Sequence, residues 1–255
     1  MLPDPDVIND FRARLQGGAS LMGTFLKLPG PHVIEVLGGV GLDFAILDEE
    51  HAPWTRETLD VGILAARASG VASIVRVARA EAASILSALD CGATGVMVPH
   101  VDSVAKAEVV ASAGRYIGGT RGAGAARGGF YGRRGPRNYE MADEEATVIA
   151  MIEDAAAIDD IDAIAAVEGI HALFIGRGDL GLSLRNARGS ADDLNASVER
   201  VAEAARRHGK GVMAVVPAPE HADTAWLRGL GVTTLAVSSD IGFLQSAARA
   251  ARQAF

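Results

Sequence analysis

Short apolar runs alternate with helix-like segments along most of the chain. Val148–Ile152 is one such run and Ala172–Ile175 is the next, with a segment of helical periodicity between them. Runs of this length, separated by about 10–15 residues of helical pattern, are typical of parallel βαβ units. The pattern predicts eight strands: Leu21–Leu26, Asp43–Leu47, Ala72–Val77, Gly95–Pro99, Val148–Ile152, Ala172–Ile175, Gly211–Val216 and Thr234–Val237.

The segments between these runs predict helices, the first of them opened by a proline. One segment, Gly114–Arg137, is rich in glycine and arginine and interrupts the rhythm. No composition shift or linker separates the units, so we expect a single domain over residues 1–255. The predicted helices are Pro31–Leu37, Thr55–Ser69, Glu81–Leu89, Ser103–Ala113, a helix around Ala191–His208, Glu220–Leu230 and Ile241–Ala254.

Eight strand–helix units in 255 residues indicate an α/β protein with a (β/α)8 TIM-barrel fold. The alternative is a doubly wound open sheet. That fold would carry a glycine fingerprint after the first strand, which this chain lacks.

Composition narrows the class of protein. Hydrophobic residues make up 49% of the chain, but no apolar run reaches the ~18 residues that cross a bilayer. The N-terminus has no secretion signal, so we expect a cytoplasmic protein. A net charge of −8 argues against nucleic acid or an anionic membrane as partner. The single cysteine, Cys91, excludes an internal disulfide and is expected to be a small buried residue.

The barrel prediction locates the functional residues, because active sites of this fold lie just after the carboxyl ends of the strands. The polar residues at those positions are Lys27, Asp48, Glu50, His51, Arg76, His100, Glu153 and Asp179.

Glu153 and Asp179 follow two consecutive predicted strands, which places them side by side at one face of the barrel. Two neighbouring carboxylates repel each other unless a cation lies between them, and Mg²⁺ or Mn²⁺ is commonly held by such a pair. The alternative is that both are solvated loop acids.

His51 and Arg76 add a base and a cation. His51 lies beside Asp48 and Glu50, as a general base oriented by carboxylates would, although it could equally be a surface-loop histidine. Arg76 interrupts an apolar strand and needs an anionic partner in the interior. That partner is either an internal acid or a substrate carboxylate.

The segment Gly176–Leu180 predicts a turn into a short helix, whose backbone N–H groups could hold a carboxylate. Together these features suit a 2-oxo acid bound through its carboxylate and keto oxygen over a metal ion, while a base moves a proton on the hydroxyl of the second substrate. This is the chemistry of a metal-dependent aldolase acting on a 2-oxo acid and an aldehyde.

Several segments resemble the HpcH/HpaI aldolase family of class II pyruvate aldolases, which act on 2-keto-3-deoxy sugar acids and hydroxy-keto diacids. The resemblance runs over nearly the whole chain, with the motifs in the family's order. They are LDEEHAPW (Leu47–Trp54), SIVRV (Ser73–Val77), LDCGATGVMVPHV (Leu89–Val101), TRGAGAAR (Thr120–Arg127), MIED (Met151–Asp154) and VEGIHALFIGRGDLGLSL (Val167–Leu184).

The resemblance implies a role for each matching residue and a homo-oligomer, a hexamer built as a trimer of dimers. It also implies a divalent metal: Mg²⁺, Mn²⁺ or Co²⁺. The implied roles are Glu153 and Asp179 as metal ligands, His51 as catalytic base, Arg76 as the residue binding the pyruvyl group, Asp48 as support for the histidine, the amides around Gly178 and Asp179 as carboxylate cradle, and Asp90 as an acid reaching the histidine of a neighbouring subunit.

Two departures from the family pattern bear on the substrate. Met151 stands where a glutamine is usual, which removes a hydrogen-bonding side chain beside the metal, and Arg177 stands where a proline is common. We hypothesise that Arg177 and the segment Arg121–Arg137 favour an acidic or polyhydroxylated aldehyde. The alternative for that segment is a subunit contact or a flexible loop.

Three other functions remain open. A Schiff-base aldolase would need a nucleophilic lysine at a strand end, and Lys27 is the candidate. A carbon–carbon lyase acting on CoA thioesters would share the two metal acids but should have more chain to hold the CoA. A non-catalytic metabolite-binding barrel would bind metal without turnover.

Overall fold

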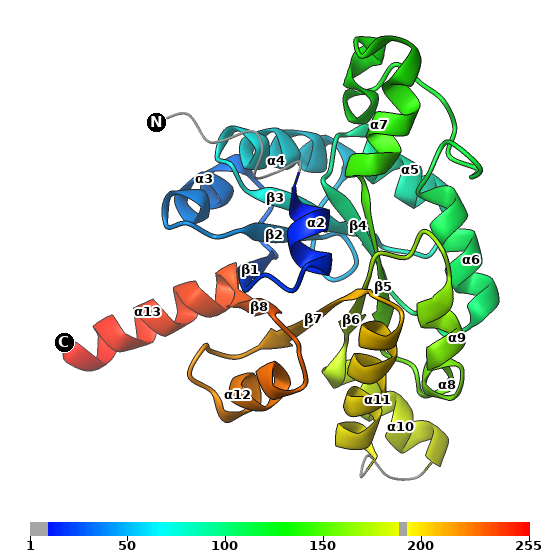
Figure 1. The fold of residues 1–255 in the computed structure, drawn as a ribbon. Helices are drawn as coiled ribbons and strands as arrows, with labels where there is room; N and C mark the ends of the chain where they lie inside the picture. Colours follow the sequence, from blue (N-terminus) through cyan, green and yellow to red (C-terminus); the bar gives the residue numbers. More distant parts are fainter. Residues whose placement is uncertain (1–9, 189–192) are drawn as a thin grey trace.

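The computed structural model describes residues 10–188 and 193–255. Eight parallel strands close into a barrel in sequence order, each pairing with the next and β8 with β1 (Figure 1). The TIM-barrel prediction is confirmed and the open sheet is wrong. The strands are β1 (Leu21–Leu26), β2 (Phe44–Asp48), β3 (Ala72–Arg76), β4 (Gly95–Val98), β5 (Thr147–Ile152), β6 (Ala172–Ile175), β7 (Gly211–Val216) and β8 (Thr234–Ser239).

Side chains alternate along each strand between the barrel interior and the layer beneath the helices, as the period of a β-strand requires. In β2, Phe44 and Ile46 belong to the interior cluster while Ala45 and Leu47 pack outward. Aromatic rings fill the interior, where Phe25 and Phe174 meet edge to face at 5.9 Å between centroids. The interior is therefore a packed core with its polar groups confined to the strand ends.

The helices of the outer layer agree with the prediction to within a few residues. Thr55 and Ser103 each cap the helix that they precede, so these helices begin one residue later than expected. The predicted start at Ala191 lies outside the described residues. The helices are α3 (Pro31–Gly39), α4 (Arg56–Ala68), α5 (Ala82–Asp90), α6 (Val104–Ala113), α8 (Ala155–Asp159), α9 (Ile161–Ala166), α10 (Arg177–Arg188), α11 (Leu194–Arg207), α12 (Ala222–Gly229) and α13 (Asp240–Ala254).

Two helices were not expected from the sequence. α2 (Phe11–Gln16) lies across the amino-terminal end of the barrel and inserts Phe11 and Leu15 into the interior cluster (Figure 1). α7 (Asn138–Glu145) follows the glycine- and arginine-rich segment. α2 is too short for a helical period to show in its sequence, and its stability comes from the two buried side chains.

The glycine- and arginine-rich segment is ordered by its own arginines, which pair with acids of the surrounding helices. Arg127 contacts Asp60 of α4 at 2.9 Å, and Arg134 contacts Glu145 of α7 at 2.7 Å. The segment contains two short 3-10 turns, η1 (Arg127–Gly132) and η2 (Gly135–Arg137).

Within the described part of the chain, no helix combines the length and hydrophobicity needed to cross a membrane.

His171, just before β6, is a neutral histidine held by the backbone. Its Nδ1 accepts from the N–H of Val148 at 2.9 Å, and its Nε2 lies 3.1 Å from Arg12 Nη1. Burial, followed by the charges of Arg12, Lys210 and Arg115, lowers the pKa of His171 to about 3. Protonating this ring in the folded protein would break the bond with Val148 and place a fourth positive charge beside three others.

The pKa of His171 predicts a loss of stability in acid. Between the unfolded pKa of 6.5 and the folded value of about 3, the unfolded chain binds a proton that the native protein excludes. The free energy of unfolding should therefore fall by about 1.4 kcal/mol per pH unit below pH 6.5, with no contribution above it. Urea unfolding between pH 7 and 4 would measure this slope.

The control is His171→Asn, which keeps a δ1 acceptor for Val148 but cannot titrate. Its stability should depend less steeply on pH than that of the parent protein below pH 6.5. Parallel curves for the two proteins would contradict the assignment.

Candidate functional site

The carboxyl ends of four strands each present a charged side chain to the barrel mouth. Each of these residues lies two positions after an apolar residue of the interior cluster. Because side chains alternate along a strand, the charged side chain also points inward. The four residues are Lys27 after β1, Asp48 in β2, Arg76 in β3 and Glu153 after β5.

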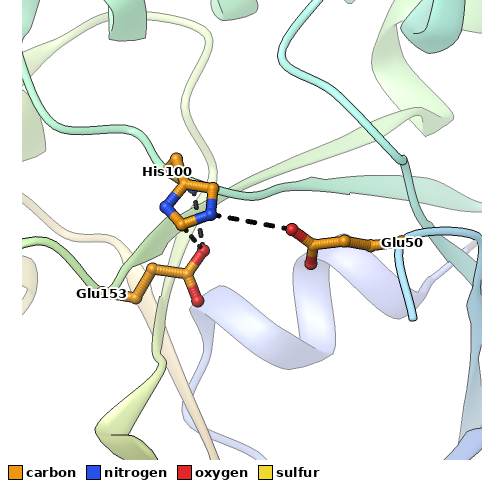
Figure 2. A group of neighbouring side chains, drawn as sticks. All are labelled: Glu50, His100 and Glu153. Carbon is orange, nitrogen blue, oxygen red and sulfur yellow. Dashed lines mark hydrogen bonds and ion pairs between the residues drawn. The ribbon is translucent and has the colours of Figure 1, made fainter. Parts of the chain in front are cut away.

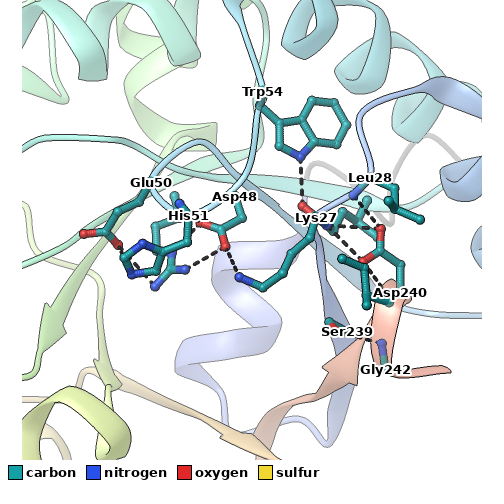
Figure 3. A network of polar contacts seen from close by, with 12 residues as sticks. Lys27, Leu28, Asp48, Glu50, His51, Trp54, Ser239, Asp240 and Gly242 are labelled. Atoms are coloured by element: carbon teal, nitrogen blue, oxygen red, sulfur yellow. Dashed lines mark hydrogen bonds and ion pairs between the residues drawn. The ribbon is translucent and has the colours of Figure 1, made fainter. Parts of the chain in front are cut away.

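Asp48 is fully buried and is the centre of a charged network (Figure 3). Arg76 grips it with two hydrogen bonds, Nε to Oδ1 at 2.8 Å and Nη2 to Oδ2 at 2.7 Å. Lys27 Nζ donates to Oδ2 at 2.8 Å, and the backbone N–H of His51 donates to Oδ1 at 3.2 Å. Burial raises the pKa of Asp48, but the bonds from Arg76 and Lys27 outweigh it and leave the pKa below its ordinary value.

Arg76 therefore has an internal acid as its partner. Its remaining nitrogen, Nη1, lies 3.2 Å from Glu50 Oε2 and 4.0 Å from the sulfur of Met151. The guanidinium carbon is 5.0 Å from the centre of the Phe25 ring, so a cation–π contact supports it from below. This packing fixes the guanidinium plane and leaves Nη1 at the mouth.

Glu50, His100 and Glu153 form a second cluster, drawn in Figure 2. Each offers a ligand atom, and these atoms lie within 4.8 Å of one another, so the cluster could hold a metal ion. The backbone N–H of His100 donates to Glu153 Oε1 at 2.9 Å, and the ring Nε2 lies 3.7 Å from Glu50 Oε1.

His100 enters the cluster through an unusual backbone conformation. Its φ of +54° lies in the left-handed region, which residues other than glycine rarely adopt. Lys106 donates to its carbonyl oxygen at 2.7 Å, and Asp154 contacts its ring at 3.0 Å. Burial lowers the pKa of His100, but the contact with Asp154 and the charges of Glu153 and Glu50 raise it overall.

Glu153 is 2% exposed and faces other acids. Burial, and then the charges of Glu50 and Asp179, raise its pKa, although the contacts with His100 oppose this shift. Glu153 and Asp179 line one cavity of about 460 Å³. The expected neighbourhood of these two residues is thus present, and Glu50 joins it.

Gly176, at the end of β6, permits this arrangement. A Cβ at this position would lie 2.8 Å from Glu153 Cβ and 2.9 Å from Met151 Cε. A larger residue would displace Glu153, so the close approach requires glycine.

The amino terminus of α10 opens onto the same cavity. Leu180 donates to the carbonyl of Gly176, so the N–H groups of Arg177, Gly178 and Asp179 have no partner within the helix. Nothing lies within 4 Å of the position of a Cβ at Gly178, so no side chain crowds this helix start. The carboxylate cradle stays a prediction, to which a helix start of this kind is suited.

Arg177 itself points elsewhere. It pairs with Asp223 of α12 at 2.7 Å, and its guanidinium stacks 5.5 Å from the ring of Trp226. Its charge therefore joins α10 to α12. Four arginines of the segment likewise pair with acids of the helices, which ties their charges to the outer layer: Arg121, Arg127, Arg134 and Arg137.

His51 lies at the mouth with 55% of its side chain exposed, and its Nε2 is 3.7 Å from Glu50 Oε2. Asp48 contacts the backbone of His51, and the contact orients the loop rather than the imidazole. Trp54 secures the other end of this loop by donating to the carbonyl of Leu26 at 2.8 Å (Figure 3).

Asp90 lies apart from this group. It ends α5 just before β4 begins, which places it toward the opposite end of the barrel. Arg121, whose side chain is almost fully buried, contacts it at 3.2 Å. Asp90 therefore does not meet His51 within one chain.

The sequence places Glu50, His100 and Lys27 at strand ends, but it does not predict Glu50 or His100 as part of the metal site. The position of Glu50 could have been predicted, since it lies two residues after the inward-facing Asp48 and so continues the same side of the strand. The position of His100 could not, because it depends on the left-handed backbone. Lys27 is ion-paired as an ammonium, which does not suit the nucleophilic lysine of a Schiff-base aldolase.

Comparison with known proteins agrees with this architecture. A family model described as HpcH/HpaI aldolase/citrate lyase matches residues 21–247. A 5-keto-4-deoxy-D-glucarate aldolase of Klebsiella pneumoniae is 32% identical over 97% of this chain and 96% of its own. A 4-hydroxy-2-oxovalerate aldolase of Novosphingobium aromaticivorans is 39% identical over 68% of this chain and 66% of its own.

Two solved structures have the same fold at similar length. The citrate synthase SbnG has a TM-score of 0.84 and 33% identity, with 96% of each chain covered. An HpcH/HpaI aldolase/citrate lyase family protein of Burkholderia cenocepacia has a TM-score of 0.88 and 29% identity, covering 96% of this chain and 98% of its own. The chain is therefore an enzyme, a carbon–carbon lyase, and belongs to the HpcH/HpaI aldolase/citrate lyase family.

Proposed function

We propose that the protein is a metal-dependent class II aldolase that joins pyruvate, or a related 2-oxo acid, to an aldehyde and cleaves the product. The observation that supports this most strongly is the buried carboxylate of Glu153. It shares a cavity with Asp179, lies beside Glu50, and opens toward the free N–H groups of α10.

The residues around Glu153 fit a divalent cation. An ionised carboxylate that is 2% exposed needs compensation, but its neighbours Glu50 and Asp179 carry the same charge. Glu50 Oε2 is also buried and accepts no hydrogen bond, although Arg76 Nη1 lies 3.2 Å from it. Glu153 and Asp179 would hold the ion, with Glu50 and His100 close by. When bound, Mg²⁺ or Mn²⁺ supplies positive charge that polarises the keto group of a 2-oxo acid.

The chain's own groups would bind and orient the 2-oxo acid. The N–H groups of Gly178 and Asp179 hold its carboxylate at the positive end of the α10 dipole. Arg76 presents Nη1 to the oxygen that gains negative charge, and Asp48 keeps the guanidinium in the required plane.

His51 acts as the base on the hydroxyl of the second substrate. Its exposed ring lies where the aldehyde half of the substrate would enter, and Asp48 fixes the backbone from which it projects. The nearby carboxylate of Glu50 stabilises the charged imidazole that proton transfer produces.

A second copy of the chain would complete the site. α13 projects away from the barrel (Figure 1) and leaves Leu244 63% exposed, as expected for a helix that packs against another subunit. Asp90 lies near the subunit surface, 17% exposed. We infer a homo-oligomer in which Asp90 reaches His51 of a neighbour, with the hexamer as its expected form.

The substrate is a 4-hydroxy-2-oxo acid or a 2-keto-3-deoxy sugar acid. Relatives of the protein are named for substrates of both types, one for 5-keto-4-deoxy-D-glucarate and one for 4-hydroxy-2-oxovalerate.

One observation favours a second candidate function, that of a carbon–carbon lyase or synthase of the citrate lyase or citrate synthase type. The citrate synthase SbnG matches this chain over 96% of both lengths. The expectation that such an enzyme would need a longer chain therefore does not separate the two functions, and the assay below includes both.

Glu153→Ala should abolish metal-dependent carbon–carbon chemistry. We expect kcat for aldol formation from pyruvate or hydroxypyruvate and a panel of aldehydes to fall about a thousandfold or more. EDTA should have the same effect on the parent enzyme, reversed by Mg²⁺ or Mn²⁺. Product formation is followed by NMR, with oxaloacetate and acetyl-CoA as a further substrate pair.

The control for this variant is Glu199→Ala, which removes an exposed acid of α11. It should retain the parent rate. A Glu153→Ala protein with unchanged turnover, or a parent enzyme indifferent to EDTA, would refute the proposal.

Gly176→Ala should weaken metal binding without unfolding the barrel. The added methyl would displace Glu153, so we expect Mn²⁺ affinity by calorimetry to fall about tenfold to a hundredfold. Gly181→Ala is the matched control, since a Cβ there meets Leu194 at an ordinary 3.5 Å. Equal Mn²⁺ affinity in both variants would show that Glu153 is not a ligand.

A shared active site predicts complementation between two impaired variants. Asp90→Asn and His51→Ala should each lose about a hundredfold or more in kcat. Hybrids made by co-expression should regain activity, because about a quarter of random neighbours pair an intact His51 with an intact Asp90. Hybrids no more active than the mean of their parents would place Asp90 outside the site.

A further inference from the structure

Lys27 is fixed at both ends, although no role has been assigned to it above. Its ammonium donates to Asp48 at 2.8 Å, and its backbone N–H donates to the buried carboxylate of Asp240 at 3.0 Å. The next amide, of Leu28, donates to Asp240 at 2.9 Å (Figure 3). A lysine anchored this firmly has little side-chain entropy left to lose when a ligand binds.

Lys27 keeps hydrogen-bonding capacity beyond its bond with Asp48. The charges around it are balanced, since Asp48 and Glu50 contribute two negative charges and Arg76 and Lys27 two positive charges. An ammonium has three N–H donors, and the bond with Asp48 uses one of them. The Lys27 side chain is still 31% exposed, which leaves donors for an oxygen atom at the barrel mouth.

The position of Lys27 selects which part of a substrate it meets. In a closed barrel of eight strands, β1 and β5 lie on opposite sides. Lys27 therefore faces Glu153 across the mouth. A 2-oxo acid held at the ends of β5 and β6 would extend its other half toward β1 and β2.

The guanidinium groups of two nearby arginines are held by acids of the protein. Arg76 is paired with Asp48 and Glu50, and Arg177 is paired with Asp223 on α12. An anionic group on the far half of the substrate would thus find its complement at Lys27.

We propose that Lys27 determines specificity by binding a carboxylate on the aldehyde half of the substrate. Asp240 is the positioning residue that holds the backbone of Lys27 in place. This assignment rests on the proposed aldolase function, and it replaces Arg177 as the source of acid preference.

The test compares aldehydes that differ only in charge. Succinic semialdehyde and 4-oxobutanamide form one pair, and glyoxylate and its amide form a shorter one, each with pyruvate as the donor. We expect the parent enzyme to prefer the acid in at least one pair. In Lys27→Met the ratio of kcat/KM for acid over amide should fall about ten- to hundredfold.

Two substitutions preserve the interpretation if Lys27→Met folds poorly. Lys27→Gln should lose the same preference with a smaller change in packing, and Lys27→Arg should retain most of it. Arg79→Gln is the matched control. This exposed charge follows β3 on the same face, and its removal should change the ratio less than about twofold.

The possible outcomes distinguish a failure of the role proposed for Lys27 from a failure of the proposed aldolase function. Exchange of the pyruvate methyl protons in D₂O requires enolate formation but no aldehyde, so a parent enzyme without exchange fails the proposed function. A parent enzyme that exchanges protons but shows no acid preference in either pair overturns the role of Lys27. An equal loss for acid and amide in Lys27→Met also overturns it, leaving Lys27 as a mere support for Asp48.

Discussion

A single buried carboxylate organises the mouth of this barrel. Asp48 is inaccessible to water, and it remains ionised because two cations and a backbone N–H surround it. The dependence is mutual, since without Asp48 the Arg76 guanidinium would be a poorly compensated cation above the Phe25 ring. Through this group, and through Asp240 below Lys27, the ends of β1, β2, β3 and β8 are joined into one rigid edge. Removing either partner of such a buried pair leaves an uncompensated charge, so the loss of one side chain should destabilise this whole edge.

The opposite edge has the reverse character. Glu153 and Asp179 follow β5 and β6, and Glu50 reaches toward them from β2, so three acids gather at this edge, while Arg76, which contacts Glu50, is shared with Asp48. Two backbone features hold this repulsive arrangement in place, the missing side chain at Gly176 and the left-handed backbone of His100. Strain and like-charge crowding of this kind oppose stability and persist where the surrounding fold enforces them. The barrel thus keeps an edge of paired charges and an edge crowded with acids on two sides of one opening.

Much of this arrangement could be predicted from strand period alone. Asp48, Arg76 and Glu153 each follow an interior apolar residue at a spacing of two, which fixes their direction before any contact is known. His100 could not be placed in this way, because its entry into the cluster depends on a φ of +54° that no local pattern signals for histidine. Arg177 was misjudged for a different reason. Its partner, Asp223, lies on another helix, and sequence spacing says nothing of which helices are adjacent. Asp90 carries no signal within one chain, since its inferred partner belongs to another copy.

Met151 illustrates how a substitution in the floor of the site alters the groups above it. Its sulfur lies 4.0 Å from Arg76 Nη1, and a thioether is only a weak acceptor. A glutamine at this position would offer a carbonyl oxygen and compete for the donor that Asp48 leaves free. With methionine, Nη1 keeps its hydrogen-bonding capacity for a ligand, while the flexible side chain packs in the interior cluster with Phe174. The departure therefore exchanges one fixed hydrogen bond for an apolar floor, and beside apolar groups the electrostatic interactions of Arg76 and Glu153 are stronger.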